Sequence, residues 1–341
     1  MAGPESNGHS SDDPLLQVEG LTKHFPIKKG LLQRTVGQVR AVDGVSFDIA
    51  KGETLALVGE SGCGKTTTGR VILHLLEPTA GTVRFKDQDL ADLSADELRR
   101  LRQRIQIIFQ DPYSSLDPRM STADIVGEGL DIHGLADGQE QLDRVTDLLE
   151  RVGLSARDLR KFPHQFSGGQ RQRIGVARAL ALEPKVIFCD EPVSALDVSI
   201  QAQIINLLKD LQQKLGLALI FIAHDLSVVR HISDRVMVMY MGQAMEVSKK
   251  SELYLRPLHP YTNALMKSVP LPDPKLAAEA RRESWLTGDM PSPYQRPRGC
   301  IFNNRCPFKV KRCEADVPAL RRMENGDWVA CHRAEELDLS I

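Results

Sequence analysis

This chain of 341 residues lacks the sequence features of nucleic-acid-binding, membrane-spanning and secreted proteins. Lys and Arg number 44 against 45 Asp and Glu, so the positive excess that drives non-specific nucleic-acid binding is absent. The longest apolar run covers residues 215–223, whereas a membrane-spanning helix needs about 18 residues. The first residues are polar and lack the apolar segment of a secretion signal. We therefore expect a cytoplasmic protein that binds no nucleic acid and does not itself cross the membrane.

Cysteine is scarce, and its placement is informative. Six cysteines in a reducing compartment argue against disulfides and favour metal ligands, packing residues or chemistry. Four lie late in the chain with C-x5-C-x6-C-x17-C spacing: Cys300, Cys306, Cys313 and Cys331. This spacing differs from the C-x2-C pairs of zinc ribbons, and Pro307 follows Cys306 directly. We predict that these four thiols bind a [4Fe-4S] cluster, with Zn²⁺ or free thiols as the alternatives.

The hydrophobic pattern divides the chain into three parts. Residues 1–14 are rich in Ser, Gly, Asp and Pro, which is typical of a disordered tail. In residues 15–255, glycines at 30, 37 and 44 indicate turns, and apolar strands at 53–58, 185–189, 217–223 and 236–240 alternate with helical patterns. This alternation predicts an α/β fold with a mainly parallel sheet. Residues 256–341 are rich in proline and contain the four cysteines, so we expect a linker and a small C-terminal domain there.

The clearest motif is a glycine-rich loop at residues 59–66, GESGCGKT, which fits G-x-x-x-x-G-K-[ST]. It follows an apolar strand and precedes a helix, so its backbone N–H groups and the helix N-terminus face one anion. Lys65 adds a positive charge near the β- and γ-phosphates, and Thr66 offers a hydroxyl to Mg²⁺. We expect these residues to bind a nucleotide: Ser61, Gly62, Cys63, Gly64, Lys65, Thr66 and Thr67.

Two carboxylates follow the strand at 185–189. The carboxyl end of a parallel strand lies near the phosphate crevice, so Asp190 is well placed to hold Mg²⁺, directly or through water. Glu191 is then the candidate general base for a water that attacks a phosphoanhydride. Cys189 and Cys63 are expected to be packing residues without a redox role.

A second anion cradle begins the helical stretch after residue 166. Ser167 is a good N-cap, and the next two glycines leave backbone N–H groups open. Because the 59–66 loop already holds the phosphates of one nucleotide, this cradle points to a second chain. The residues concerned are Ser167, Gly168, Gly169 and Gln170.

Together, the 59–66 loop, FSGGQ at 166–170 and VIFCDE at 186–191 resemble the ATP-binding cassette of ABC transporters. The resemblance implies a P-loop NTPase fold with an antiparallel β subdomain and a helical subdomain at about residues 111–165. Four further residues match family motifs: Gln110 (Q-loop and Mg²⁺), Asp197 (D-loop), His224 (switch histidine, catalytic with Glu191) and Phe25 (adenine stacking). For Phe25, a position in the core of a strand is the alternative.

A closer resemblance lies in the segments HFPIKKG, IIFQDPYSSLDPRM, HPYTNALMKSVP and GCIFNNRCPF. They are similar to the oligopeptide/dipeptide (and nickel) importer branch, in which a [4Fe-4S] cluster occurs in this tail. The resemblance implies an ATP-hydrolysing subunit that powers peptide import from the cytoplasmic face of the plasma (inner) membrane. Its implied partners are a related but different ATPase chain, two membrane permeases and an extracytoplasmic peptide-binding protein. The alternatives are a nickel or sugar importer and a non-transport ABC switch.

Overall fold

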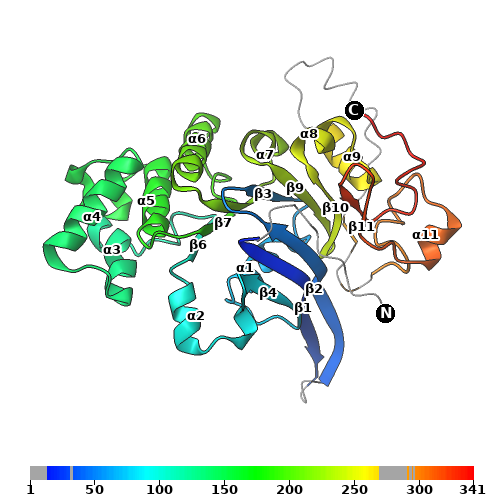
Figure 1. Cartoon of the computed structure of the whole chain (residues 1–341), viewed down its shortest axis with the longest axis horizontal. Coiled ribbons are helices and arrows are strands. Elements are labelled where there is room, and N and C mark those ends of the chain that lie inside the picture. The colour runs from blue at the N-terminus through cyan, green and yellow to red at the C-terminus, as the bar shows by residue number, and fades with distance from the viewer. Residues whose placement is uncertain (1–13, 31–33, 269–289, 292–293, 295) are drawn as a thin grey trace.

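The computed structural model describes residues 14–30, 34–268, 290–291, 294 and 296–341. The expected tail at 1–14 lies outside the described residues except for Pro14, and so do several of the linker prolines. Figure 1 shows helices at one end of an extended molecule, two sheets in its middle and the C-terminal segments at the other end. Among the described residues, no helix combines the length and apolar character that a membrane span requires.

Among the described residues, an eight-stranded sheet forms the centre of the molecule. It is mainly parallel, as the sequence predicts, with four parallel strand pairings and three antiparallel pairings at one side. Strand β3 is buried along its whole length, and its alternate side chains belong to two different hydrophobic cores. The expected apolar runs therefore form strands covered on both faces. The strand order is β11 (Arg321–Arg322), β12 (Trp328–Val329), β10 (Gln243–Lys249), β9 (Arg235–Tyr240), β3 (Thr54–Val58), β8 (Ala218–Ile222), β7 (Val186–Asp190) and β6 (Ile105–Ile108).

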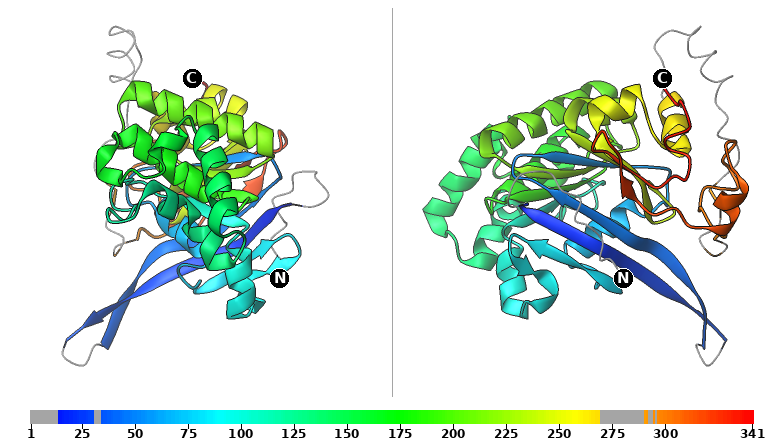
Figure 2. Two further views of the ribbon diagram at one scale, coloured as in Figure 1. Left: turned by 90° about the vertical axis from the view of Figure 1, so that its left-hand side faces the viewer. Right: turned by 45° about the vertical axis from the view of Figure 1, so that its right-hand side comes forward.

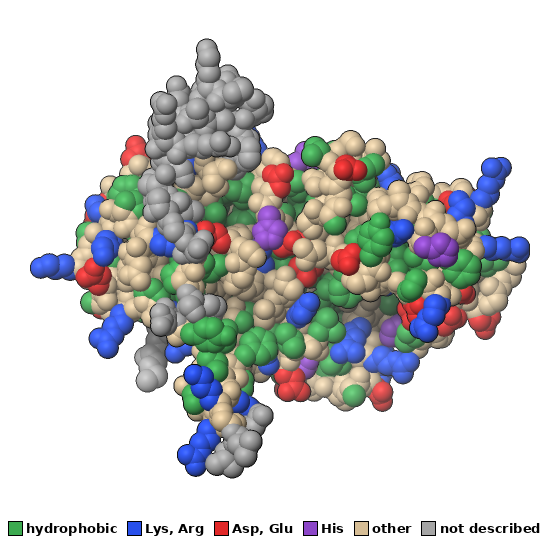
Figure 3. Space-filling view, turned by 180° about the vertical axis from the view of Figure 1, so that it is seen from behind, with side chains coloured by type: hydrophobic (Ala, Val, Ile, Leu, Met, Phe, Trp, Pro, Cys, Tyr) green, Lys and Arg blue, Asp and Glu red, His purple; other side chains and the backbone are tan. Residues whose placement is uncertain are grey.

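Helix α1 (Lys65–Ile72) and a second, antiparallel sheet cover one face of the central sheet. The order of this sheet is β2 (Arg34–Ile49), β1 (Leu16–Lys29), β4 (Ala80–Phe85) and β5 (Gln88–Asp89). Figure 2 shows β1 and β2 projecting as a long arm, and Figure 3 shows Lys and Arg side chains on that arm. The antiparallel β subdomain implied by the resemblance is therefore present.

The turns predicted at Gly37 and Gly44 are wrong. Gly37 pairs with Ile27 inside the long β1–β2 ladder. Gly44 has a φ of 77° and lies where the register shifts between the Leu21–Val45 and Thr22–Asp43 pairs. It is the extra residue of a β-bulge, a position that needs a positive φ just as a turn does.

Helices cover the other face of the central sheet and extend beyond it at one end (Figure 1). Capping boxes begin α3 and α5, where Ser121 pairs with Asp124 and Ser167 with Gln170. The helical pattern expected between the apolar strands at 185–189 and 217–223 is present as α6. These helices are α3 (Thr122–His133), α4 (Gly138–Arg151), α5 (Gly168–Leu180), α6 (Val198–Leu215) and α7 (Leu226–Ile232). Helix α2 (Ala95–Leu101) instead packs on the first face, where Leu98 and Leu101 join the core shared by α1 and the antiparallel sheet.

Residues 256–341 are here called the C-terminal region, and its described elements pack against the edge of the central sheet. Its described elements are α9 (Pro260–Lys267), α11 (Lys311–Ala315), β11 and β12, which follow α8 (Lys250–Leu255). Strand β12 pairs with β10 through Glu246–Val329 and Val247–Trp328. The region therefore continues the sheet that carries the candidate site.

Candidate nucleotide-binding site

A cavity of about 330 Å³ opens at the carboxyl ends of the central strands. In α/β folds this edge is where ligands bind. The cavity brings together nine of the residues predicted for nucleotide binding and catalysis: Ser61, Gly62, Gly64, Lys65, Thr66, Thr67, Gln110, Glu191 and His224.

Close backbone packing shapes the 59–66 loop. A Cβ at Gly59 would lie 2.2 Å from the Met239 carbonyl oxygen, and one at Gly64 would lie 2.2 Å from the Ala41 carbonyl oxygen. Both glycines also have positive φ, so larger side chains are excluded. Helix α1 begins at Lys65 directly after the loop, and its N-terminal N–H groups favour an anion in the cavity.

Lys65 is the cation of this loop. Its Nζ donates to the carbonyl oxygens of Gly59, at 2.8 Å, and Glu60, at 3.1 Å. The side chain of Cys63 is buried and does not line the cavity, and burial raises the pKa of its thiol. Burial likewise raises the pKa of the Cys189 thiol, so both behave as packing residues.

Oxygen donors suited to Mg²⁺ meet at the start of α1. Thr66 Oγ1 donates to Asp190 Oδ1 at 2.8 Å. Burial raises the pKa of Asp190, while this hydrogen bond and the charges of Arg70 and Lys65 act in the opposite direction. A hydroxyl beside a carboxylate at the mouth of a phosphate loop matches the oxygen ligands that Mg²⁺ prefers. The predicted pair therefore fits the metal.

Glu191 is held between two other polar residues of the cavity wall, Gln110 and His224. Gln110 Nε2 donates to Glu191 Oε2 at 2.7 Å, and His224 Nε2 pairs with Glu191 Oε1. Glu191 is 8% exposed and has a φ of 48°, an uncommon backbone conformation that is often found at functional sites. A carboxylate in this place can orient a water and accept its proton.

Phe25 lies beside the cavity but does not line it. It pairs with Val39 across the β1–β2 ladder, and Val39 does line the cavity. The ring is 37% exposed, and Lys23 Nζ lies 5.3 Å from its centre. The alternative of a buried strand position is wrong, whereas stacking on adenine stays a prediction.

The residues of the second cradle lie outside the cavity. Ser167 is the N-cap of α5, and its Oγ accepts the Gln170 N–H at 3.3 Å. Asp197 is the N-cap of α6. A Cβ at Gly168 would lie 3.3 Å from Leu196, and one at Gly169 would lie 2.4 Å from Ile200. The two glycines therefore allow the start of α5 to pack closely on the start of α6. Within one chain, Ser167, Gly168, Gly169, Gln170 and Asp197 do not meet the 59–66 loop in this cavity.

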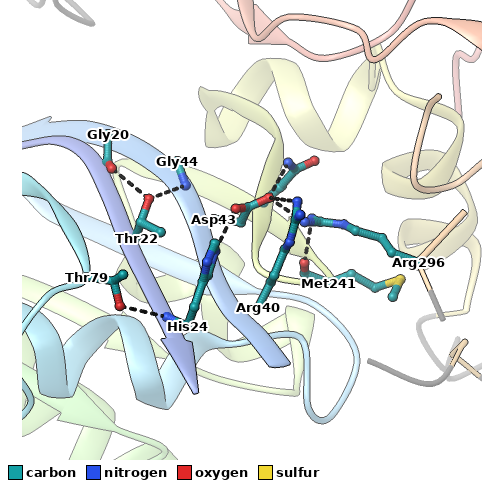
Figure 4. Close-up of polar contacts among 10 residues, drawn as sticks. Gly20, Thr22, His24, Arg40, Asp43, Gly44, Thr79, Met241 and Arg296 are labelled. Atoms are coloured by element: carbon teal, nitrogen blue, oxygen red, sulfur yellow. Dashed lines mark hydrogen bonds and ion pairs between the residues drawn. The ribbon is translucent and has the colours of Figure 1, made fainter. Parts of the chain in front are cut away.

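Arg296 and Met290 of the C-terminal region also line the cavity, and the sequence interpretation missed both. Figure 4 shows Arg296 reaching Asp43 and the Met241 carbonyl oxygen, to which its Nη2 donates at 3.0 Å. Burial by itself raises the pKa of Asp43. The contacts with His24 and Arg296 lower this pKa by more than burial raises it, so the net shift is downward. Asp43 and Arg296 are 253 positions apart, so no local pattern connects them.

The four late cysteines line a second, small cavity of about 20 Å³, together with His259 and Phe302. Burial and the neighbouring thiols raise the pKa of Cys306 to about 11 and that of Cys331 to about 12. In the described part of the chain, however, no three His, Cys, Asp or Glu side chains are arranged to hold a metal ion. The structure therefore groups the thiols, but it does not present the preformed metal site that the spacing predicts.

Family models and solved structures match this architecture. The family described as "ABC transporter" matches residues 42–194, and "Oligopeptide/dipeptide transporter, C-terminal region" matches residues 245–313. The dimeric post-hydrolysis ATP-binding cassette MJ0796, bound to ADP and Pi, has a TM-score of 0.61 and 30% identity, covering 69% of this chain and 98% of its own. The cassette cbiO1 of Clostridium perfringens gives the same TM-score and identity over 71% of this chain and 91% of its own. Fold and motifs thus define an ABC ATPase.

A relative of similar length indicates the branch of the family to which this chain belongs. The oligopeptide transport ATP-binding protein AppF of Bacillus subtilis (strain 168) is 51% identical over 324 residues, which cover 95% of this chain and 98% of the relative. The chain belongs to the ATP-binding subunits of the oligopeptide/dipeptide branch of the ABC transporter family.

Proposed function

We propose that this chain hydrolyses ATP to power the import of dipeptides or oligopeptides through a membrane ABC transporter. The observation that carries the proposal is the convergence of the 59–66 loop, Gln110, Glu191 and His224 on one cavity. The match of residues 245–313 to the oligopeptide/dipeptide C-terminal family supports peptides as the cargo, and so does the name of the relative AppF.

In this proposal the loop N–H groups and Lys65 bind the phosphates of ATP, and Phe25 contacts the adenine. Glu191 orients the attacking water and accepts its proton, while His224 and Gln110 fix the carboxylate and face the γ-phosphate. Because phosphoryl transfer depends on positioning and charge neutralisation, this hydrolysis needs no covalent intermediate.

Thr66, Asp190 and the amide oxygen of Gln110 would hold Mg²⁺. The proposal is supported by the hydrogen bond between Thr66 and Asp190 at the mouth of the loop. When bound, the metal neutralises phosphate charge during hydrolysis.

The second cradle, at residues 167–170, indicates which other chains this protein binds. We propose that residues 167–170 and Asp197 act on the nucleotide of a second cassette, a related but different chain, in a head-to-tail pair. The dimeric cassette MJ0796 supports such a pairing. The pair would sit at the cytoplasmic face of the inner membrane, bound to two permeases that receive cargo from an extracytoplasmic peptide-binding protein.

Purification of the assembled complex tests this function. We expect two permease subunits to copurify with the chain, and a peptide-loaded binding protein to stimulate ATP hydrolysis. Stimulation by a nickel- or sugar-loaded binding protein instead would replace peptide with that cargo. A chain that purifies with ribosomes or DNA and without permeases would identify a non-transport switch.

We also propose that the four cysteines bind a [4Fe-4S] cluster with a structural role. All four line one cavity in a small, proline-rich region, where a metal centre would supply folding energy. Anaerobically purified protein should absorb broadly near about 400 nm and contain roughly four irons and four sulfides per chain. One zinc without iron would favour a zinc site, and protein without either metal would leave the cysteines as buried thiols.

A further inference from the structure

Glu60, the second residue of the phosphate loop, forms a bidentate ion pair with Arg305 of the C-terminal region. Arg305 Nη1 donates to Glu60 Oε2 at 2.6 Å, and Nη2 donates to Oε1 at 2.9 Å. The Arg305 side chain is 8% exposed, and that of Glu60 is 26% exposed. A shielded, two-pronged pair of this kind is among the stronger and more directional polar contacts in proteins.

A second contact from the same region reaches the backbone of Glu60. The Glu60 N–H donates to Tyr261 Oη at 2.9 Å. Tyr261 is fully buried, and its ring packs against Tyr240, with centroids 4.8 Å apart, and against Phe302, at 5.3 Å. Because Phe302 lies between Cys300 and Cys306, this aromatic cluster connects the cysteine-lined cavity to the loop.

The third contact joins Glu60 to Lys65, which lines the nucleotide cavity. Its carbonyl oxygen accepts from Lys65 Nζ at 3.1 Å and from the Cys63 N–H at 3.2 Å. A displacement of Glu60 would therefore move the groups that face the phosphates. Small displacements in such a loop have large effects because every N–H must point at the anion.

We propose that Arg305 and Tyr261 are positioning residues that hold the phosphate loop in its nucleotide-binding shape. Through them, the C-terminal region sets the affinity of the cassette for ATP, although neither residue lines the nucleotide cavity. The inference rests on ATP binding at the 59–66 loop and is independent of the cargo and of any metal at the cysteines.

The test uses the full chain with Arg305→Gln, Glu60→Gln and the double variant. Isothermal titration with MgATP should show about tenfold weaker binding for each single variant, because the loop loses the same constraint in both cases. The double variant should bind no more weakly than Arg305→Gln, since both changes break the same Glu60–Arg305 ion pair. Arg305→Lys should restore part of the affinity, because it keeps the charge but not the two-pronged geometry.

Arg312→Gln is the matched control. Arg312 belongs to the same region, is 67% exposed and pairs only loosely with Asp316, at 3.7 Å. In the assembled complex, Arg305→Gln should raise the KM for ATP and leave kcat nearly unchanged, whereas Arg312→Gln should alter neither.

Wild-type affinity in a folded Arg305→Gln variant would overturn the inference, and so would independent, additive losses in the double variant. If Arg305→Gln fails to fold, Glu60→Gln decides alone, because its side chain is partly exposed. Failure of the wild-type chain to bind MgATP would instead contradict the ATPase assignment on which the inference rests.

Discussion

At the scale of single residues, the geometry around Glu191 favours its proposed role as the general base. Its two carboxylate oxygens have different partners, Gln110 on one side and His224 on the other. These partners follow separate strands, β6 and β8, so the carboxylate is fixed from two sides. A group held in this way can orient a water with little loss of conformational freedom at the moment of reaction.

We expect Glu191→Gln to bind MgATP normally while hydrolysis slows by about 10²- to 10⁴-fold, because the amide cannot accept the proton of water. Equilibrium binding and single-turnover hydrolysis in the assembled complex measure the two effects. Unchanged turnover at the site of this chain would exclude Glu191 as the base.

At the scale of elements, contact between α1 and β7 determines where the phosphate loop sits. A Cβ at Gly69 would lie 1.8 Å from the Phe188 ring, so the helix approaches the sheet as closely as glycine permits. Gly175 in α5 is the opposite case, since a Cβ there would meet no described atom of a neighbouring element within 4 Å.

Gly69→Ala should therefore destabilise the protein by about 1–3 kcal/mol, the usual cost of overpacking a core. Gly175→Ala is the control and should stabilise it by about 0.5–1 kcal/mol, because alanine favours the helix. Urea unfolding of both variants measures the difference, and equal effects would show that α1 can shift away from β7.

Glu246 attaches β10 to the segment that precedes α9. Its carboxylate is fully buried and accepts the N–H groups of Leu258 and His259, each at 2.9 Å. Burial raises the pKa of Glu246 to about 7 from an ordinary 4.5. Burial also lowers the pKa of His259 to about 3, so the imidazole beside it stays neutral in this range.

Between pH 4.5 and 7 the folded state thus binds a proton that the unfolded state has released. The stability contributed by this proton is complete below pH 4.5 and is lost as the pH rises through 7. We expect Glu246→Gln, which does not titrate, to remove this part of the pH dependence. Urea unfolding from pH 5 to 8 measures the free energy of unfolding of wild type and variant. The difference between the two free energies should change with pH, and a difference that stays constant would contradict the assignment.

Motifs and strands that depend on a local pattern can be predicted from the sequence. Contacts between residues far apart in the chain cannot. The loop at 59–66, Asp190, Glu191 and the interior strands are predictable because each is encoded within a few residues. Turns are wrongly predicted at Gly37 and Gly44 because glycine serves a strand or a bulge as well as a turn, and only the register of β1 and β2 decides between them. The contacts of Arg296 and Arg305 join parts of the chain more than 240 positions apart, as the separations of 253 and 245 show.

At the scale of the whole molecule, the phosphate loop and the second cradle proposed at residues 167–170 do not meet within one chain. The 59–66 loop opens into the cavity, while Ser167 lies at the start of α5 outside it. This arrangement favours a pair of cassettes, each completing the site of the other.

Ser167→Arg should leave ATP binding by the single chain near normal, because the substitution lies away from the cavity. It should prevent the ATP-driven pairing of two cassettes, since a bulky cation would replace a helix cap at the contact. Size-exclusion chromatography with MgATP in the Glu191→Gln background measures pairing. Ser155→Arg, at the start of a short helical turn elsewhere, is the control, and normal pairing of Ser167→Arg would contradict the role in trans.

The pairing of β12 with β10 also has a consequence for biosynthesis. On the ribosome, β10 is made well before Trp328 and Val329, the residues that pair with it. Until they emerge, the outer edge of the central sheet exposes unpaired N–H and C=O groups, which are templates for strand addition by other chains. Late residues of the sequence therefore protect the nascent cassette from aggregation, and a stop codon before position 321 would produce a chain whose fold is nearly complete but whose sheet is open.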